Sequence, residues 1–507
     1  VFVKFFSNHI IIKVNKEEVS FEANPEDRVR TKNKLKRELY KLLNRSTKKD
    51  LPWGTLTGIR PVKIALKGLE DGLPEDNVKD IMEKEYLASS EKANLSVKVA
   101  KRELDILKTF NYKEGYSLYV GIPFCPKRCI YCSFASNDIN KKEEYVDVYL
   151  EALKKEITYV SQAFSQLKLF TIYVGGGTPT ALNEERLNSL LKFINSKFDL
   201  SNLKEYTVEA GRPDTITYEK LMVMKKAGVT RISINPQTMN NNTLKVIGRN
   251  HTAADVRNAF ALARRLGFNN INMDIIIGLP GEGIGEVKNT MEEIIKLKPE
   301  SLTVHSLAIK RTSMLNLDKD DYRNLDFTFD IKISELTAKY ARELGMKPYY
   351  LYRQKNIAGN LENIGYAKSG FEGIYNILIM EEKHTIAACG AGTDSKFVRF
   401  NEQGKEIDVN RINNVKDLDN YINRIDEMIE KKRSFILSNY KTFNIDEDKI
   451  ITDMRENIYH GILVSKLSGM LAKEMGLSDE ECYEIKVAGI LHDIGKLRLA
   501  DRKSTRL

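Results

Sequence analysis

The chain has 507 residues, a formal net charge of +10 and five cysteines. Its length exceeds what one hydrophobic core usually supports, so we expect two or three domains. Five cysteines, three of them in one short loop, do not form a disulfide framework, and no apolar run approaches the roughly 20 residues of a membrane span. We therefore expect a cytoplasmic protein without a membrane partner.

The positive charge would suit an anionic partner such as nucleic acid or a polycarboxylate. Lysines, however, are spread along the whole chain with acidic residues between them. This distribution favours a solvated lysine-rich surface over a nucleic-acid-binding stripe, so nucleic acid is not among the partners that we expect.

Residues 1–110 predict a small α+β domain. The first residues, VFVKFFSNHIIIKV, alternate as a β-strand does and do not resemble a signal peptide, and charged amphipathic helices follow. The sequence begins with Val1 rather than Met, so we expect N-terminal residues to be missing from it.

Residues 111–310 alternate strand-type runs with helical patterns at the spacing of βα units. The strand-type runs are YSLYVGI, FTIYVGG, EYTVEAG, TRISINP, NINMDIIIG and SLTVHSL. Helical stretches such as EERLNSLLKFINSKF and AADVRNAFALARRLG lie between them. Six such units predict an α/β fold in which a parallel (β/α)6 sheet forms an incomplete barrel.

Three cysteines, Cys125, Cys129 and Cys132, lie in the loop GIPFCPKRCIYCSF after the first strand-type run. The CxxxCxxC spacing offers three thiolates, and a 4Fe-4S cluster held by three thiolates leaves one iron open to an exogenous ligand. The spacing differs from that of zinc ribbons, and no histidine lies near enough to complete a short zinc knuckle. The loop predicts an iron–sulfur cluster, with a structural zinc site or free thiols as the alternatives.

Unusual residues lie at or near the ends of the other strand-type runs, the edge that carries the chemistry in barrels of this kind. They are the glycine turn at 175–177 with Thr178, then Glu209, Gln237, Asp274 and the segment from His305 to Ala308. A glycine turn exposes backbone N–H and C=O groups to a ligand, and Glu209 and Arg249 could pair with the ammonium and carboxylate of an amino-acid moiety. Each feature alone is weak, but six strand ends together predict a binding site.

The motifs CPKRCIYC, YVGGGTPT, TVEAG, INPQTMN, IGRNH and MDIIIGLPG resemble the radical SAM superfamily, and within it the oxygen-independent coproporphyrinogen III oxidase family. The later segments YRQKNIAGNLENIGYAKSG and CGAGTDSKF resemble its HemZ-type branch, and the resemblance covers about residues 1–433. In that family S-adenosylmethionine binds the open iron, and one electron from the reduced cluster cleaves it to a 5′-deoxyadenosyl radical. The radical takes a hydrogen from a propionate of coproporphyrinogen III, and loss of CO2 and a further electron leaves a vinyl group, a step of haem biosynthesis.

The resemblance also implies roles for single residues. Cys125, Cys129 and Cys132 match the ligands of the 4Fe-4S cluster, and it assigns no catalytic residue. Residues that match contacts to the S-adenosylmethionine on the cluster are Tyr119, Gly176 and Glu209. Residues that match contacts to a second S-adenosylmethionine molecule are Tyr131, Gly177, Thr178, Gln237, Arg249, Asp274 and Ala308. Ordinary strand packing is the alternative for Tyr119, Asp274 and Ala308.

The partners that the resemblance implies are a porphyrinogen or haem-type small molecule and an electron donor such as flavodoxin or ferredoxin. Two positions depart from the family pattern, because Phe134 stands where the oxidases carry a fourth cysteine and Gly121 where they carry histidine. Haem chaperones of the same fold also carry an aromatic residue at the first position. A haem-binding chaperone is therefore an alternative function, and a radical SAM methyltransferase is a further one.

Residues 311–433 are expected to form the C-terminal, substrate-covering region of the oxidase-like part, and residues 434–507 a separate helical segment. That segment carries His460 and the motif LHDIGK with His492 and Asp493. It resembles the opening half of an HD or HD-GYP phosphohydrolase domain, whose histidine and aspartate ligands suit divalent metals. The chain stops before the remaining ligands, so we expect an incomplete metal site of His460, His492 and Asp493. We also expect the last residues, DRKSTRL, to be encoded by a sequencing adapter and the gene to continue.

Overall fold

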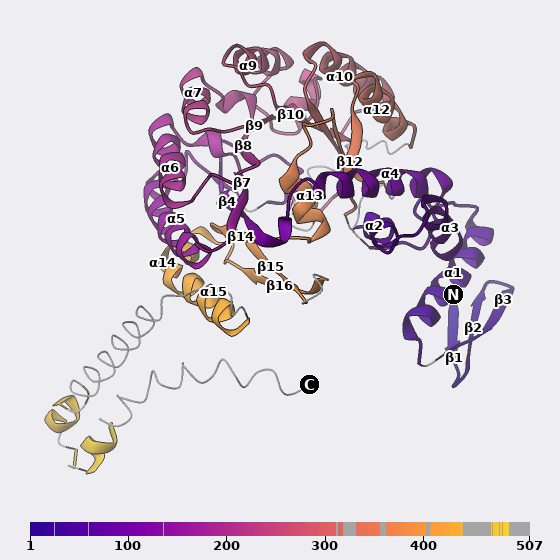
Figure 1. The fold of residues 1–507 in the computed structure, drawn as a ribbon, viewed down its shortest axis with the longest axis horizontal. Helices are drawn as coiled ribbons and strands as arrows, with labels where there is room; N and C mark the ends of the chain where they lie inside the picture. Colours follow the sequence, from indigo (N-terminus) through magenta and orange to yellow (C-terminus); the bar gives the residue numbers. More distant parts are fainter. Residues whose placement is uncertain are drawn as a thin grey trace. The chain divides into compact units, whose positions relative to one another are not determined.

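A computed structural model describes residues 1–24, 26–58, 60–134, 136–310, 313–317, 331–354, 361–401, 406–439, 468, 470–475, 477–478 and 480–485 (Figure 1). The chain divides into two compact units. The first comprises Val1–Ile157 with Leu167–Asn423, and the second comprises Thr158–Gln166 with Arg424–Leu507. None of the described helices has the length and apolar character needed to cross a membrane.

An 11-stranded sheet forms the centre of the first unit, with the strand order β12-β13-β11-β10-β9-β8-β7-β4-β14-β15-β16. Six neighbouring strands run parallel and coincide with the six strand-type runs of the sequence. They are β4 (Gly115–Ile122), β7 (Lys168–Gly176), β8 (Glu205–Gly211), β9 (Arg231–Ile234), β10 (Ile271–Ile277) and β11 (Ser301–Ser306). The order has two ends, so the described strands form an open sheet. The expected α/β fold with a (β/α)6 arrangement is confirmed.

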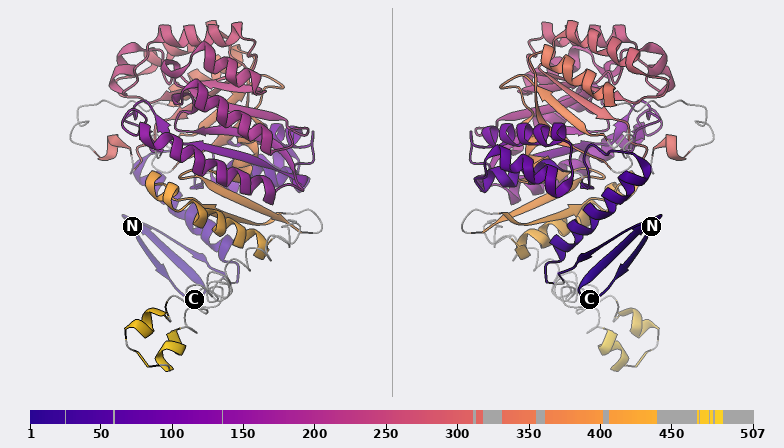
Figure 2. Two further views of the ribbon diagram at one scale, coloured as in Figure 1. Left: turned by 90° about the vertical axis from the view of Figure 1, so that its left-hand side faces the viewer. Right: turned by 90° about the vertical axis from the view of Figure 1, so that its right-hand side faces the viewer.

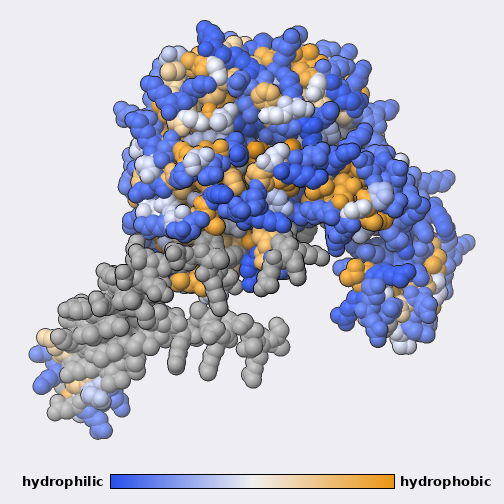
Figure 3. Space-filling view, in the orientation of Figure 1, coloured by the Kyte–Doolittle hydropathy of each residue, from blue (hydrophilic) through white to orange (hydrophobic). Residues whose placement is uncertain are grey.

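Helices that follow the parallel strands lie on the outer side of the sheet (Figure 1). They are α5 (Glu143–Ala163), α6 (Glu184–Lys197), α7 (Tyr218–Lys226), α9 (Ala253–Arg265) and α10 (Ile284–Leu297). The short helix α8 (Asn241–Val246) follows β9, and its Leu244 packs in one cluster with Ile130 of the cysteine loop. In α6, Leu187, Leu190, Leu191 and Ile194 are buried at helical spacing, and the Asn183 side chain caps the first turn. The strands are buried on both faces, as parallel strands usually are. Hydrophilic residues cover most of the outer rim (Figure 3).

Residues beyond the six βα units extend the same sheet at both ends. Next to β11 lie β13 (Asn363–Ala367) and β12 (Lys347–Tyr352), both antiparallel to their neighbours. Next to β4 lies β14 (Thr385–Cys389) in parallel, followed by the antiparallel β15 (Asp394–Phe400) and β16 (Glu406–Asn413). Other helices of this region are α11 (Met314–Leu317), α12 (Ile331–Glu343), α13 (Ile374–Glu381) and α14 (Leu418–Asn423). The domain boundaries near residues 110, 310 and 433 stay predictions.

The N-terminal residues form a small antiparallel sheet of β1 (Phe2–Phe5), β2 (His9–Val14) and β3 (Glu17–Glu22), seen in both views of Figure 2. Ile10, Ile12 and Val14 point to one face of β2 and pack with Leu42 of α1 (Arg28–Thr47). The helices α2 (Val62–Glu70), α3 (Glu75–Tyr86) and α4 (Ser90–Leu107) follow. The alternation of the first fourteen residues thus corresponds to two real strands.

The second unit contains α15 (Ile425–Asn439), in which the Arg433 guanidinium lies 5.6 Å from the centre of the Tyr159 ring. His460, His492 and Asp493 lie outside the described residues. The HD-like metal site therefore stays a prediction.

Helix α9 begins at a complete capping box. The Thr252 hydroxyl accepts from the backbone N–H of Asp255, whose carboxylate accepts from the N–H of Thr252. We predict that Thr252→Ala lowers the free energy of unfolding by about 1 kcal/mol. Chemical denaturation checks this value. Thr252→Ser retains the hydroxyl and is expected to unfold near the wild-type midpoint, whereas an equal loss in both variants would contradict the role of the cap.

Candidate cofactor site

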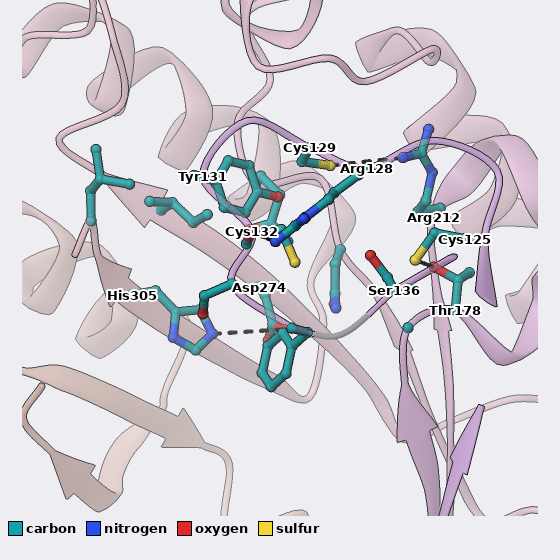
Figure 4. A pocket seen from close by; sticks show the side chains of 18 of the residues that line it. Cys125, Arg128, Cys129, Tyr131, Cys132, Ser136, Thr178, Arg212, Asp274 and His305 are labelled. Atoms are coloured by element: carbon teal, nitrogen blue, oxygen red, sulfur yellow. Dashed lines mark hydrogen bonds and ion pairs between the residues drawn. The ribbon is translucent and has the colours of Figure 1, made fainter. Parts of the chain in front are cut away.

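A cavity of about 260 Å³ lies where the carboxyl ends of the six parallel strands meet (Figure 4). Its lining residues come from β7, β8, β10 and β11, from the segments after β4, β8, β9 and β11, and from β12 and β13 with the residue Gln354. The predicted site residues that line it are Cys125, Cys129, Tyr131, Cys132, Gly176, Gly177, Thr178, Glu209, Gln237, Arg249, Asp274 and Ala308. The fold thus brings together residues that are up to 183 positions apart, from Cys125 to Ala308.

The cysteine loop, residues 123–139, is held by backbone hydrogen bonds. Its first part forms β5 (Phe124–Cys125), which pairs with β6 (Asn137–Asp138). The Asn137 N–H donates to the Pro123 carbonyl at 2.8 Å, and the Cys132 N–H donates to the Cys129 carbonyl at 3.1 Å. These bonds fix the loop at both of its ends and in its middle, so that the three cysteines face the same cavity.

The three thiols form the donor set of this loop. Burial raises the pKa of Cys125 to about 11 and also raises the pKa of Cys132, so both groups are protonated at neutral pH unless a metal stabilises the thiolates. No three His, Cys, Asp or Glu side chains in the described part of the chain are arranged to hold a metal ion. A cubane binds each thiolate through a different iron, and it therefore takes sulfur atoms that stand farther apart than the ligands of a single ion. The donor set fits a cluster.

The glycine turn at 175–177 is shaped by contacts within the chain. A Cβ atom at Gly177 would lie 2.6 Å from the Phe124 carbonyl oxygen, and one at Gly175 would lie 2.9 Å from the Glu209 carboxyl carbon. Gly176 adopts a φ of +105°, which disfavours other residues. The sequence suggested that these glycines make room for a ligand, but at Gly175 and Gly177 the absent Cβ makes room for the protein itself. Gly176 and Gly177 nevertheless line the cavity.

Glu209 places a partly buried carboxylate on the cavity wall near the end of β8. The Tyr173 hydroxyl donates to its Oε1 atom at 2.5 Å. Burial raises the pKa of Glu209 to about 7, the nearby Asp274 charge adds to this, and hydrogen bonds from Tyr173 and the Gly176 backbone oppose it. Among the described residues no cation forms an ion pair with Glu209. A ligand ammonium group would supply that missing positive charge.

Arg249 places a buried guanidinium on the same cavity, 8% exposed. It donates to the Tyr131 hydroxyl at 3.1 Å and to the Asn235 carbonyl at 3.5 Å. Gln237, with a φ of +66°, bridges to β10, because its N–H donates to the Asp274 carbonyl and its own carbonyl accepts from Ile276. Buried polar atoms on this cavity without a hydrogen-bond partner in the described structure are Ser136 Oγ, Asn235 Oδ1, Gln237 Oε1 and Arg249 Nε. Because buried polar atoms usually have a hydrogen-bond partner, these atoms indicate that the cavity binds a polar ligand.

Asp274 of β10 and Ala308 after β11 also line the cavity. The His305 Nε2 atom lies 3.8 Å from Asp274 Oδ2, and the Asn272 amide donates to Oδ1 of Asp274 at 2.7 Å. Burial acts to raise the pKa of Asp274, but His305, Asn272 and Thr303 together outweigh it and lower the pKa. The Tyr352 hydroxyl lies 3.3 Å from the other ring nitrogen of His305. Asp274 is therefore a charged carboxylate with a defined hydrogen-bond environment.

Tyr119 is the predicted site residue that is not among those lining the cavity. Its ring stacks with Tyr173 at 6.0 Å and with Tyr375 at 6.2 Å between centroids, and burial raises its pKa. The hydroxyl oxygen lies 3.5 Å from where a Cβ of Gly176 would stand. Tyr119 thus supports the glycine turn from within the barrel, in keeping with strand packing.

The two departures from the oxidase pattern have different surroundings. A Cβ atom at Gly121 would lie 2.7 Å from the Thr393 methyl group, so a histidine there requires a rearrangement of the segment CGAGTDSKF. Phe134 is 63% exposed and lines the cavity. Position 121 is therefore tied to the packing of this chain, whereas position 134 is open to a ligand.

Arg212 is a site residue that sequence reasoning missed. It follows β8 directly, three residues after Glu209, and its guanidinium donates to the Lys127 carbonyl at 3.0 Å and to Cys129 Sγ at 3.7 Å (Figure 4). Its position directly after a strand was a usable signal, because the carboxyl ends of parallel strands carry the site residues in barrels of this kind. Lys310, two residues after Ala308, also lines the cavity and was missed.

Comparisons with known proteins agree with this geometry. Residues 119–294 match the radical SAM superfamily. The chain is 42% identical over 409 residues to the oxygen-independent coproporphyrinogen-III oxidase-like protein HemZ of Bacillus subtilis, covering 80% of this chain and 81% of that protein. It is 40% identical over 203 residues to the haem chaperone HemW of B. subtilis, covering 40% of this chain and 53% of that protein. The fold resembles that of coproporphyrinogen III oxidase HemN of Escherichia coli, a radical SAM enzyme, with a TM-score of 0.50 and 21% identity over 64% of this chain and 73% of that chain.

The HemZ similarity spans most of both chains, and the superfamily match includes the cysteine loop and the ends of β4 to β10. The chain belongs to the radical SAM superfamily and, within it, to the family of oxygen-independent coproporphyrinogen-III oxidase-like proteins.

Proposed function

We propose that this chain is a radical SAM enzyme that converts coproporphyrinogen III to protoporphyrinogen IX by oxygen-independent oxidative decarboxylation. Membership of the superfamily implies a 4Fe-4S cluster and S-adenosylmethionine as cofactors. The observation that carries the proposal is the cavity that gathers three thiols, a carboxylate and a guanidinium at one edge of the sheet. When bound, the two cofactors supply hydrogen-atom abstraction from a propionate side chain of the substrate.

The proposed function assigns cluster-binding and cofactor-binding roles to residues of the cavity. Cys125, Cys129 and Cys132 would hold the cluster, and Glu209 and Arg249 would hold the ammonium and carboxylate of S-adenosylmethionine. Residues that would complete the cofactor contacts are Tyr119, Tyr131, Gly176, Gly177, Thr178, Gln237, Asp274 and Ala308.

Basic side chains on the same cavity support a polycarboxylate substrate. Lys127, Arg128 and Lys310 line it together with Arg249. Lys310 is half-buried, and burial lowers its pKa, so an anionic partner would stabilise its charge. The propionates of coproporphyrinogen are such anions. An electron donor such as flavodoxin or ferredoxin would reduce the cluster.

A haem chaperone is the second candidate. Two observations favour it: the similarity to the HemW protein and the exposed Phe134 at the cavity where the oxidases carry cysteine. An exposed aromatic ring can stack on the flat face of a porphyrin.

The first prediction concerns the cluster. Replacing Cys125, Cys129 and Cys132 together by alanine is expected to abolish the iron and sulfide content and the visible absorbance of anaerobically reconstituted protein, because no thiolate ligand remains in the loop. Cys482→Ala is the control and should retain both. Iron and sulfide that persist in the triple variant would contradict the assignment.

The second prediction concerns S-adenosylmethionine. Only ionised Glu209 can pair with the ligand ammonium, so protonation competes with binding, and affinity should rise as pH increases through about 7. Between pH 6 and pH 8 we expect about a tenfold gain, measured by anaerobic equilibrium dialysis. Glu209→Gln should lose about 10-fold to 100-fold in affinity at pH 8, corresponding to about 1.5–3 kcal/mol, and should bind almost independently of pH. A wild-type pH dependence in this variant would rule out Glu209 as the ammonium partner.

The third prediction separates the two functions. Reconstituted protein with dithionite, S-adenosylmethionine and coproporphyrinogen III is expected to form 5′-deoxyadenosine and protoporphyrinogen IX, detected by chromatography. The same protein without coproporphyrinogen is the control. Tight stoichiometric haem binding with no turnover of coproporphyrinogen would instead establish the chaperone function, and Phe134→Ala should then weaken that binding.

A further inference from the structure

Arg212 connects the cluster loop to the end of β8. Its Nη1 atom donates to the Lys127 carbonyl at 3.0 Å and to the Cys129 sulfur at 3.7 Å, and the residue is only 3% exposed. One nitrogen therefore contacts both the backbone of the loop and one of its thiols. The contact joins residues that are 83 positions apart in the sequence.

Asp214 holds this guanidinium in place. Its two carboxylate oxygens accept from Arg212 Nε at 3.1 Å and from Nη2 at 2.8 Å, which leaves Nη1 directed at the loop. The ring of His251 lies behind the carboxylate, with Nδ1 at 3.7 Å from Asp214 Oδ1. A planar guanidinium can form this bidentate pair with the carboxylate and still donate a hydrogen bond through its third nitrogen. A lysine ammonium cannot reproduce the bidentate geometry.

The three thiols differ in the groups that surround them. Thr178 Oγ1 lies 3.4 Å from Cys125 Sγ, and the backbone N–H of Phe134 interacts with the Cys132 thiol. Both of these hydrogen-bond neighbours are neutral. Positive charges also act on these two thiols through space, from Arg212 at Cys125 and from Arg128 and Arg249 at Cys132. Cys129 has a charged donor, Arg212, at hydrogen-bond distance of its sulfur.

We propose that Arg212 is a positioning residue that fixes the cysteine loop and raises the reduction potential of the cluster through its charge beside Cys129. The inference rests on the proposed function in one respect, that the three cysteines hold a 4Fe-4S cluster. Reduction adds one negative charge to the cluster, and a buried positive charge at one ligand stabilises the reduced form more than the oxidised form. Hydrogen bonds to cluster sulfurs act in the same direction.

The test is an EPR-monitored redox titration of the reconstituted cluster without S-adenosylmethionine. Arg212→Gln removes the charge but keeps a hydrogen-bond donor, and its midpoint potential is expected to be lower than that of the wild type. Asp214→Asn removes the opposite charge, and its potential is expected to be higher. The double variant removes one charge of each sign and should lie between the two single variants.

Two further variants separate this effect from loss of structure. Arg186→Gln removes one cation from an ion-paired site with Glu143 and Asp147 on α5, away from the cavity, and should leave the potential unchanged. Arg212→Lys keeps the positive charge but loses the bidentate geometry. The midpoint potential of its cluster should therefore lie closer to the wild-type value than that of Arg212→Gln. If Arg212→Gln fails to load iron while Arg212→Lys loads it, the result supports the positioning role, and the sign of the shift in Asp214→Asn tests the electrostatic role.

Equal potentials in the wild type, Arg212→Gln and Asp214→Asn would overturn the inference, as would shifts of the same sign in both variants. These outcomes leave the proposed function standing. A wild-type protein that holds a cluster but does not turn over coproporphyrinogen would contradict the proposed function alone, and the potentials could still be measured on it.

Discussion

The site depends on the close approach of two backbone segments, the glycine turn after β7 and the cysteine loop after β4. The Gly177 N–H donates to the Ile122 carbonyl and the Thr178 N–H donates to the Phe124 carbonyl, both at 2.8 Å. A side chain at Gly177 would collide with these carbonyls, because its Cβ would lie 2.6 Å from the Phe124 oxygen. The contact places Thr178 beside Cys125 and Gly176 on the cavity wall. The glycine turn therefore holds the cysteine loop in place and also forms part of the cavity wall.

Three charged groups at the cavity have a defined partner within the protein. Arg212 forms an ion pair with Asp214, Arg249 donates to the neutral Tyr131 hydroxyl, and His305 lies beside Asp274. Glu209 differs, since in the described structure it has hydrogen bonds but no cation, and its pKa is therefore raised to about 7. A carboxylate in this condition gains most from a positively charged ligand, which is why Glu209 is the residue on which cofactor affinity should depend most strongly.

The chain is similar both to an oxidase-like protein and to a haem chaperone, so similarity alone does not choose between these two functions. Gly121 is explained by packing under Thr393, and that packing involves the strands that extend the sheet beyond the six βα units. Phe134 has no such explanation in the fold, because its side chain is exposed at the cavity. Phe134 and the cations that line the same cavity are therefore the residues whose surroundings should distinguish a porphyrinogen substrate from a haem ligand.

The sequence by itself determined the parallel (β/α)6 order, the cysteine loop and twelve of the 28 described residues that line the cavity. It could do so because a short run rich in apolar and β-branched residues marks each strand, and because the ends of parallel strands share one edge of a sheet, so that position along the chain predicts position in space. Tertiary structure alone decided the contacts between loops that are distant in sequence. Three features depend on which side chains meet across the sheet: the contact of Arg212 with Cys129, the packing of Gly121 against Thr393, and a Glu209 carboxylate without a cation among the described residues. Local sequence patterns carry no information about such long-range contacts.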